Sequence, residues 1–174
     1  MTENSLSEFE KLREVVQRLR AEDGCPWDRE QTHESLKPEC IEEAAEVICG
    51  INILKETGNA ENLQEELGDL LLQVLLHAQI AKEEGLFTID DVCRGVSEKM
   101  IRRHPHVFGG QKEENADAVP ALWEAIKQQE KAGKEETLKY LPDAFDEAEK
   151  LIERARIRKG FGKPAVTIPE EAGK

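Results

Sequence analysis

The sequence predicts an all-α protein, a helical bundle without a β-sheet. Apolar residues recur at the three- and four-residue spacing of a helix in several long segments, and no segment shows sustained alternation with β-branched residues. Capping residues, glycine and proline separate these segments. At 174 residues, the chain has the length of one domain and can bury a core if its helices assemble compactly.

The N-terminal part should form two helices with a turn between them. Apolar residues at helical spacing predict a first helix over about residues 5–21, and the segment 23–26 around Gly24 prevents it from continuing. Trp27 follows in a segment expected to be a loop, where it would be a structural anchor. Pro38 suits the first turn of a second helix, which should run to about Glu56.

A third helix should follow the second after a very short break. Asn59 is a good N-cap, and the helix should run to Glu84, where Gly85 supplies the stop. Because the break at residues 57–59 is short, the second and third helices should be antiparallel neighbours.

Three more helices are expected in the C-terminal half. Thr88 and Asp91 resemble a capping box for the fourth, which ends before Pro105. A polar, glycine-rich loop over 106–117 should follow, and Pro142 should begin the sixth helix. The expected ranges are 89–104, 119–132 and 142–159. We expect the second, third and fourth helices to form the centre of the bundle.

The charge of the chain limits the kinds of molecule that it can be expected to bind. The net charge is −13 and 35% of the residues are charged, so the protein should repel nucleic acid and anionic membranes. An anionic substrate would need metal ions. No apolar run reaches the roughly 18 residues of a membrane span, and the acidic N-terminus is unlike a signal peptide, so we expect a cytoplasmic protein. The four cysteines form no CxxC pair and should be reduced thiols.

Two acidic pairs share one helical spacing in the predicted hairpin. Glu43-x-x-Glu46 lies on the second helix and Glu66-x-x-Asp69 on the third, and residues three apart share a helix face. With a rise of about 1.5 Å per residue, Glu46 and Asp69 both lie roughly 17 Å from Gly58, so the two pairs are level. Converging carboxylates are unfavourable without a cation, and oxygen ligands favour Mg²⁺ or Mn²⁺ over zinc. The four acids therefore predict a hard-metal site.

The third helix carries these acids on a polar stripe through an otherwise apolar segment. The stripe consists of Asn62, Glu66, Asp69, Gln73 and His77. A ferritin-like di-iron site would need Glu-x-x-His on two helices, which is absent here. His77 is interpreted as a packing residue or as a residue behind the metal ligands.

Cationic and aromatic residues form a second candidate group. Lys99 and Arg103 share a face of the fourth helix and could contact phosphates. Trp123 and Lys127 repeat this spacing on the fifth helix, where a ring and an ammonium group could hold a base and a phosphate. Each pair alone is equally typical of a packed or solvated surface.

The sequence resembles the MazG family of nucleoside triphosphate pyrophosphohydrolases. The resemblance rests on CPWDREQTHESLKP, EEAAEV, EELGDLLLQVLLHAQIA, EKMIRRHPHVFG and WEAIKQQEK, which follow one another in the family's order. It implies the all-α NTP pyrophosphatase fold and Mg²⁺, with Mn²⁺ as a substitute. The implied metal ligands are Glu43, Glu46, Glu66 and Asp69, with Glu42 and Glu65 supporting them or orienting water. Lys99 and Arg103 would contact phosphates, and Trp123 and Lys127 the nucleotide.

The best-known family members join two such domains in tandem, whereas one is recognised here. Residues 1–133 would form the pyrophosphohydrolase domain, and 134–174 would resemble the connector of tandem members. The connector's expected Gly-Phe-Asp-Trp is replaced by Gly160-Phe161-Gly162-Lys163.

The function implied is Mg²⁺-dependent hydrolysis of nucleoside triphosphates at the α-phosphorus, giving monophosphate and pyrophosphate, as nucleotide-pool house-cleaning. A dedicated dUTP or phosphoribosyl-ATP pyrophosphohydrolase is the alternative enzyme, and a catalytically silent oligomerisation or regulatory module is the alternative outside enzymes. The very apolar third helix favours a homo-oligomer, with a dimer expected; Leu71, Leu72, Leu75 and Leu76 point in different directions.

Overall fold

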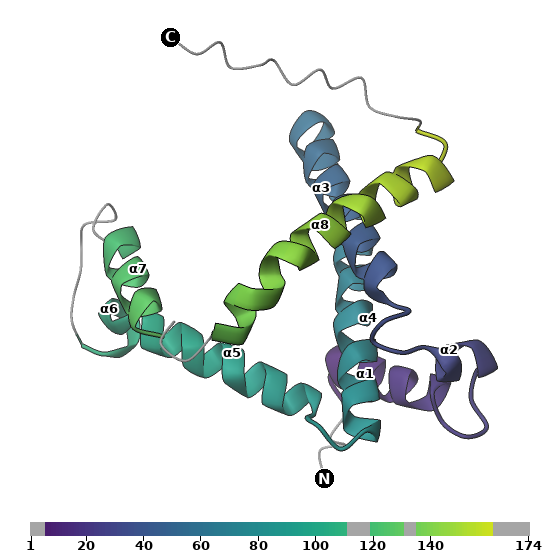
Figure 1. Cartoon of the computed structure of the whole chain (residues 1–174), viewed down its shortest axis with the longest axis horizontal. Coiled ribbons are helices and arrows are strands. Elements are labelled where there is room, and N and C mark those ends of the chain that lie inside the picture. Colours follow the sequence, from purple (N-terminus) through teal and green to yellow (C-terminus); the bar gives the residue numbers. More distant parts are fainter. Residues whose placement is uncertain (1–5, 111–118, 131–134, 162–174) are drawn as a thin grey trace.

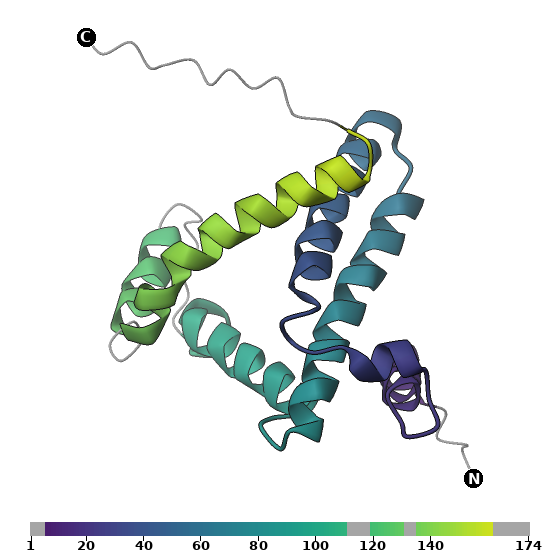
Figure 2. The ribbon, with the colours of Figure 1, turned by 45° about the vertical axis from the view of Figure 1, so that its right-hand side comes forward.

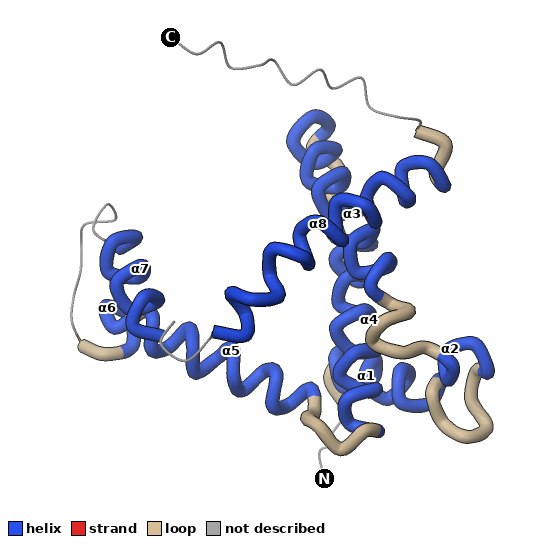
Figure 3. Tube along the Cα trace, viewed as in Figure 1, coloured by secondary structure: helices blue, strands red, loops and turns tan. Residues whose placement is uncertain are grey.

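The computed structural model describes residues 6–110, 119–130 and 135–161, and all regular structure in these ranges is helical (Figures 1 and 3). This confirms the predicted fold class. The helices are α1 Glu8–Leu19, α2 Pro26–Glu30, α3 Lys37–Thr57, α4 Glu61–Glu83, α5 Ile89–Arg103, α6 Pro105–Phe108, α7 Val119–Glu130 and α8 Glu135–Arg158. None of the helices in these ranges is long and apolar enough to cross a membrane.

α3 and α4 form a hairpin, and their contact is the most extensive between any two helices of the described residues (Figure 2). Gly58 ends α3 with a φ of 76°, a conformation that side chains disfavour, and its N–H donates to the Leu54 carbonyl at 2.9 Å. The N-cap of α4 is Ala60, one residue later than predicted, because the Asn59 side chain accepts the Glu61 N–H at 2.8 Å from outside the helix. The antiparallel arrangement is confirmed.

A glycine lets the two helices approach closely. Gly50 is buried, and a Cβ added to it would lie 2.7 Å from the Leu63 Cα. No side chain fits at this distance, so α3 and α4 touch almost backbone to backbone. The acid pairs Glu43/Glu46 of α3 and Glu66/Asp69 of α4 both lie farther from the Gly58 turn than this approach.

The buried core lies where α1 crosses the C-terminal half of α4. Its buried members are Val16, Leu36, Leu75, Leu76 and Ile80. Leu36 comes from the segment before α3, so this core also fixes where that helix begins. Elsewhere along the hairpin, α8 packs against α3.

The predicted arrangement of the bundle is wrong. After the turn at Gly85, where φ is 73°, the Thr88–Asp91 capping box starts α5 in a direction that leaves the hairpin (Figure 1). In its place α8 crosses α3, and Lys37 Nζ pairs with Glu147 at 3.2 Å. Local signals define where α5 begins but not the angle at which it leaves α4.

Three elements differ from the predicted ranges. α2 and α6 are short helices that begin at Pro26 and Pro105, in segments expected to be loops, because proline is favourable in a first helical turn. α8 begins at Glu135 and continues through Pro142, which was predicted to start it. The proline ring removes one backbone donor, and α8 accommodates this in an exposed segment. α1, α3, α4 and α5 match the predicted ranges to within three residues, and the predicted end of α7 lies outside the described residues.

We predict that Gly50→Ala lowers the free energy of unfolding by about 1–3 kcal/mol, because the new methyl group must push α4 away from α3. Gly95→Ala is the matched control: Gly95 is exposed on α5 with nothing within 4 Å of the added Cβ. Because alanine has a higher helix propensity than glycine, Gly95→Ala should raise the free energy of unfolding by up to about 1 kcal/mol. Urea unfolding followed by circular dichroism measures both, and equal effects would contradict the close approach.

Candidate functional site

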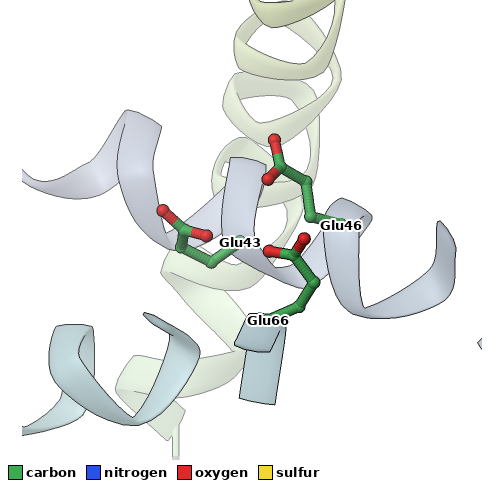
Figure 4. A group of neighbouring side chains, drawn as sticks. All are labelled: Glu43, Glu46 and Glu66. Carbon is green, nitrogen blue, oxygen red and sulfur yellow. The ribbon is translucent and has the colours of Figure 1, made fainter. Parts of the chain in front are cut away.

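Three carboxylates from the two hairpin helices meet in one cluster. Glu43 and Glu46 of α3 and Glu66 of α4 each offer an oxygen, and these oxygens lie within 4.8 Å of one another (Figure 4). Glu66 is buried and the other two are half-buried. The three-residue spacing on α3 places its pair on the face that α4 approaches.

Hydrogen bonding and burial orient these side chains. Asn62, one turn before Glu66, donates from Nδ2 to Glu66 Oε1 at 2.8 Å. Glu66 and Gln73 of the predicted polar stripe are both buried, so the stripe faces the protein interior rather than solvent. The acid on α4 is therefore held in place before any ligand binds.

Asp69 lies beside the cluster rather than in it. Burial raises the pKa of Glu43, and the charges of Asp69 and then Glu66 raise it further. Asp69 is thus close enough to act on Glu43 electrostatically, although it does not share the common oxygen position of the other three acids.

The two supporting acids occupy different environments. Glu42 is buried and pairs with α8, with its Oε1 atom 2.9 Å from Lys159 Nζ and a second ion pair to Arg158. Glu65 is exposed on α4 and has no contact with the cluster. Of the two, Glu42 alone is close to the α3 acids.

Of two cations that sequence reasoning did not assign, Lys159 reaches the cluster and Arg158 lies beside it. Lys159 pairs with Glu46 as well as with Glu42, and Arg158 lies 3.9 Å from Glu39. The signal in the sequence was the basic stretch RIRK at the end of a helix in a strongly acidic chain. Only the packing of α8 on α3 shows which acids these cations meet.

A cavity of about 410 Å³ adjoins the cluster between α3, α4 and α8. Most of its wall is apolar, including Ile41, Ile53 and Ile152, and Glu46 and Glu66 contribute to the same wall. A ligand held at the carboxylates therefore has an apolar space beside it.

The cluster fits a hard divalent ion. Two oxygens on one Mg²⁺ lie at most about 4.2 Å apart, twice the metal–oxygen distance, so small rotations of the glutamate side chains suffice to bring all three onto one ion. Carboxylate oxygens are the donors that Mg²⁺ and Mn²⁺ prefer. Burial, and then the charges of Asp69 and Glu66, raise the pKa of Glu43, and a bound cation would favour its ionised form against both.

The predicted phosphate- and nucleotide-binding residues form a separate group. Arg103 on α5 pairs with Glu130 on α7 at 2.5 Å and lies 5.8 Å from the centre of the Trp123 ring. Arg103, and then Arg102, lower the pKa of Glu130 to about 2. Lys127 pairs only weakly, with Glu124 at 3.5 Å.

This second group lies apart from the acids. Figures 1 and 2 both place α7 at the far end of α5, away from the α3/α4 hairpin. Lys99 lies on α5 as well and makes no ion pair with the described acids. A single chain therefore does not bring the four residues to the carboxylate cluster.

His77 contacts His33 and Cys40 rather than the acids of the cluster. Its Nδ1 atom lies 2.7 Å from Nδ1 of His33, with the rings stacked 5.0 Å apart, and its Nε2 atom lies 3.2 Å from Cys40 Sγ. The pKa of His77 is lowered, mainly by burial and then by His33. The packing interpretation of His77 agrees with these contacts.

Comparison with known proteins identifies the family. Residues 31–108 match the model of the MazG nucleotide pyrophosphohydrolase domain, a segment that contains all the acids of the cluster. The chain belongs to the MazG family. The MazG-family match includes Lys99 and Arg103 but ends before Trp123 and before α8.

Similar proteins support the same assignment. The chain is 52% identical over 126 residues to the nucleoside triphosphate pyrophosphohydrolase/pyrophosphatase MazG of Thermotoga maritima, covering 72% of this chain and 46% of that protein. It is 45% identical over 130 residues to the nucleoside triphosphate pyrophosphohydrolase of Escherichia coli K12, covering 74% and 48%. It is also 50% identical over 149 residues to the uncharacterised YabN of Bacillus subtilis, covering 83% and 29%. The chain thus spans less than half of each of these three relatives.

A solved structure shares the fold. The crystal structure of a mazG-related protein from Thermotoga maritima superposes with a TM-score of 0.54 at 29% identity, covering 68% of this chain and 98% of that one. The all-α fold of the MazG family is therefore present here.

We predict that acid destabilises the protein through His77. Its pKa in the folded state is lowered, so the stability that neutral His77 contributes is present above the ordinary value of about 6.5 and is lost as the pH falls through the lower folded value. The free energy of unfolding measured with urea should therefore fall more steeply from pH 7.5 to pH 5.5 for the wild type than for His77→Gln. His106→Gln, outside the pair, is the control and should follow the wild type. Parallel pH profiles for all three proteins would contradict this role.

Proposed function

We propose that this protein hydrolyses nucleoside triphosphates at the α-phosphorus, releasing nucleoside monophosphate and pyrophosphate. The observation that carries the proposal is the cluster of Glu43, Glu46 and Glu66 within the segment that matches the family. Its relatives named nucleoside triphosphate pyrophosphohydrolases agree with this activity.

We assign the metal ligands to Glu43, Glu46, Glu66 and Asp69. A bound Mg²⁺, or Mn²⁺ in its place, would neutralise the triphosphate and activate water. The three clustered acids would hold the ion, and Asn62 keeps Glu66 in position. Asp69 adds negative charge beside Glu43.

The attacking water needs an acceptor for its proton. Glu42 and Glu65 are the proposed groups, because each precedes a proposed ligand and is not itself a ligand. Glu42 must first exchange its ion pairs with α8, whereas Glu65 is free in solvent.

Substrate binding by Lys99, Arg103, Trp123 and Lys127 requires a second chain in this arrangement. We propose a homodimer in which α5 and α7 of one copy face the acids of the other. The hairpin carries the exposed apolar side chains Ile48, Ile51, Leu67 and Val74, which suit contact with another chain. Residues 1–133 would then form the catalytic domain in a cytoplasmic enzyme, and 134–174 a connector-like extension.

The strongest competing function is a catalytically silent module. The ion pairs of Lys159 with two α3 acids favour it, because they neutralise carboxylates that a catalytic metal would need. A dedicated dUTP or phosphoribosyl-ATP pyrophosphohydrolase is the other alternative, and a substrate panel separates it from a general enzyme.

We predict that the protein, given Mg²⁺ and each common triphosphate in H₂¹⁸O, produces pyrophosphate and a monophosphate that carries the label. Attack at the α-phosphorus puts the oxygen of water into the monophosphate. Glu66→Gln should lower kcat by about 100-fold or more through loss of a metal ligand. Glu56→Gln is the control, since Glu56 is exposed on the same hairpin away from the cluster.

Chromatography and mass spectrometry identify these products. Release of diphosphate and orthophosphate, or label in pyrophosphate alone, would refute cleavage at the α-phosphorus. Full activity of Glu66→Gln would refute the metal assignment, and no hydrolysis of any triphosphate would favour the silent module.

We predict that light scattering gives twice the mass of one chain, and that Ile51→Glu yields a folded monomer with little activity. The charged side chain would be buried without a partner in the proposed interface. Val15→Glu is the matched control, because Val15 is similarly exposed but lies on α1. A wild-type monomer with full activity would rule out the shared site.

A further inference from the structure

The C-terminal turn of α8 places two positive side chains against the acids of α3. Lys159 Nζ lies 2.9 Å from Glu42 Oε1 and also pairs with Glu46. Arg158 pairs with Glu42 and lies 3.9 Å from Glu39 Oε1. Among the described residues, every ion pair to these three α3 acids comes from Arg158, the last residue of α8, or from Lys159, which follows it.

One of these acids belongs to the carboxylate cluster. Glu46 Oε1 faces the Lys159 ammonium, while Glu46 also contributes an oxygen to the group with Glu43 and Glu66. An ammonium and a divalent ion cannot lie side by side on the same carboxylate without strong repulsion between like charges. The metal and Lys159 therefore weaken each other's binding at Glu46.

We propose that Lys159 and Arg158 are part of the metal centre: they compete with the divalent ion for the α3 carboxylates and thereby set the metal affinity. This inference rests on the metal site of the proposed function. Because coupling between two binding events is reciprocal, metal binding also releases the last turn of α8 from α3.

The end of α8 is built to exchange in this way. Gly160 follows Lys159 with a φ of 78° and ends the helix, so the two cations lie on a terminal turn that can open without unfolding the rest. The middle of α8 stays attached through the Glu147 pair with Lys37 and through Ile152, which lines the cavity. Release of the terminal turn also opens the cavity wall to which Lys159 contributes.

This exchange explains how so acidic a cluster folds before metal binds. The cations of α8 offset charge on Glu42 and Glu46, which would otherwise repel Glu43 and Glu66. The metal then takes over this neutralisation, and its net affinity is the difference between the two interactions.

The test measures Mn²⁺ binding to the full chain by isothermal titration calorimetry. Lys159→Gln should bind Mn²⁺ about tenfold more tightly than the wild type, and Arg158→Gln with Lys159→Gln more tightly still. Lys150→Gln is the matched control, because it removes the same charge from α8 at a residue without a described ion pair. Its affinity should equal that of the wild type.

A second readout follows the last turn of α8 directly. Mn²⁺ should speed hydrogen exchange at the amides of Lys159 and Gly160, which donate to Ala155 and Ile157 in the present structure. Amides in the middle of α8 should not change. Unchanged exchange at the terminal turn would overturn the release.

The outcomes separate this inference from the proposed metal function. If the wild type binds Mn²⁺ and Glu66→Gln does not, the metal site stands. If Lys159→Gln then binds Mn²⁺ no more tightly than Lys150→Gln, the competition is overturned. Absence of Mn²⁺ binding in the wild type and in the double variant overturns both. Binding that is detected only in the double variant supports the competition.

Discussion

Repulsion between acidic side chains on α3 and α4 is the constraint on which the site depends. The hairpin packs these helices almost backbone to backbone at Gly50, which keeps their carboxylates close together. Positive charge must therefore be supplied locally. In the described structure α8 supplies it, which connects the position of a distant helix to the charge of the site.

The sequence predicted the hairpin because its signals are local. Pro38, Gly58 and the apolar spacing each act within one or two turns, and a short break allows only antiparallel neighbours. The convergence of Glu43, Glu46 and Glu66 follows from those same helices. This much of the site could be predicted by counting residues along two known elements.

The remainder depends on contacts between segments far apart in the chain. Lys159 meets Glu46 across more than a hundred residues, and no spacing in the sequence encodes that contact. The direction of α5 after Gly85 is equally non-local, so the prediction placed α5 in the bundle where α8 lies. Helix rotation explains the smaller differences, since Glu65 faces solvent and Asp69 lies just outside the common oxygen position.

The cations of α5 are also paired within the chain already, in their case with a carboxylate. Arg103 and Arg102 pair with Glu130, whose pKa of about 2 keeps it ionised at every physiological pH. A phosphate that binds Arg103 would therefore compete with a carboxylate, just as we propose that a metal at Glu46 competes with Lys159. Both exchanges replace a pairing within the chain by a pairing with ligand, so the substrate and its metal gain only the difference between them. In the proposed dimer this favours ligands that carry several charges at once, because a metal-bound triphosphate would satisfy both groups together, whereas a monophosphate or a free metal would satisfy one.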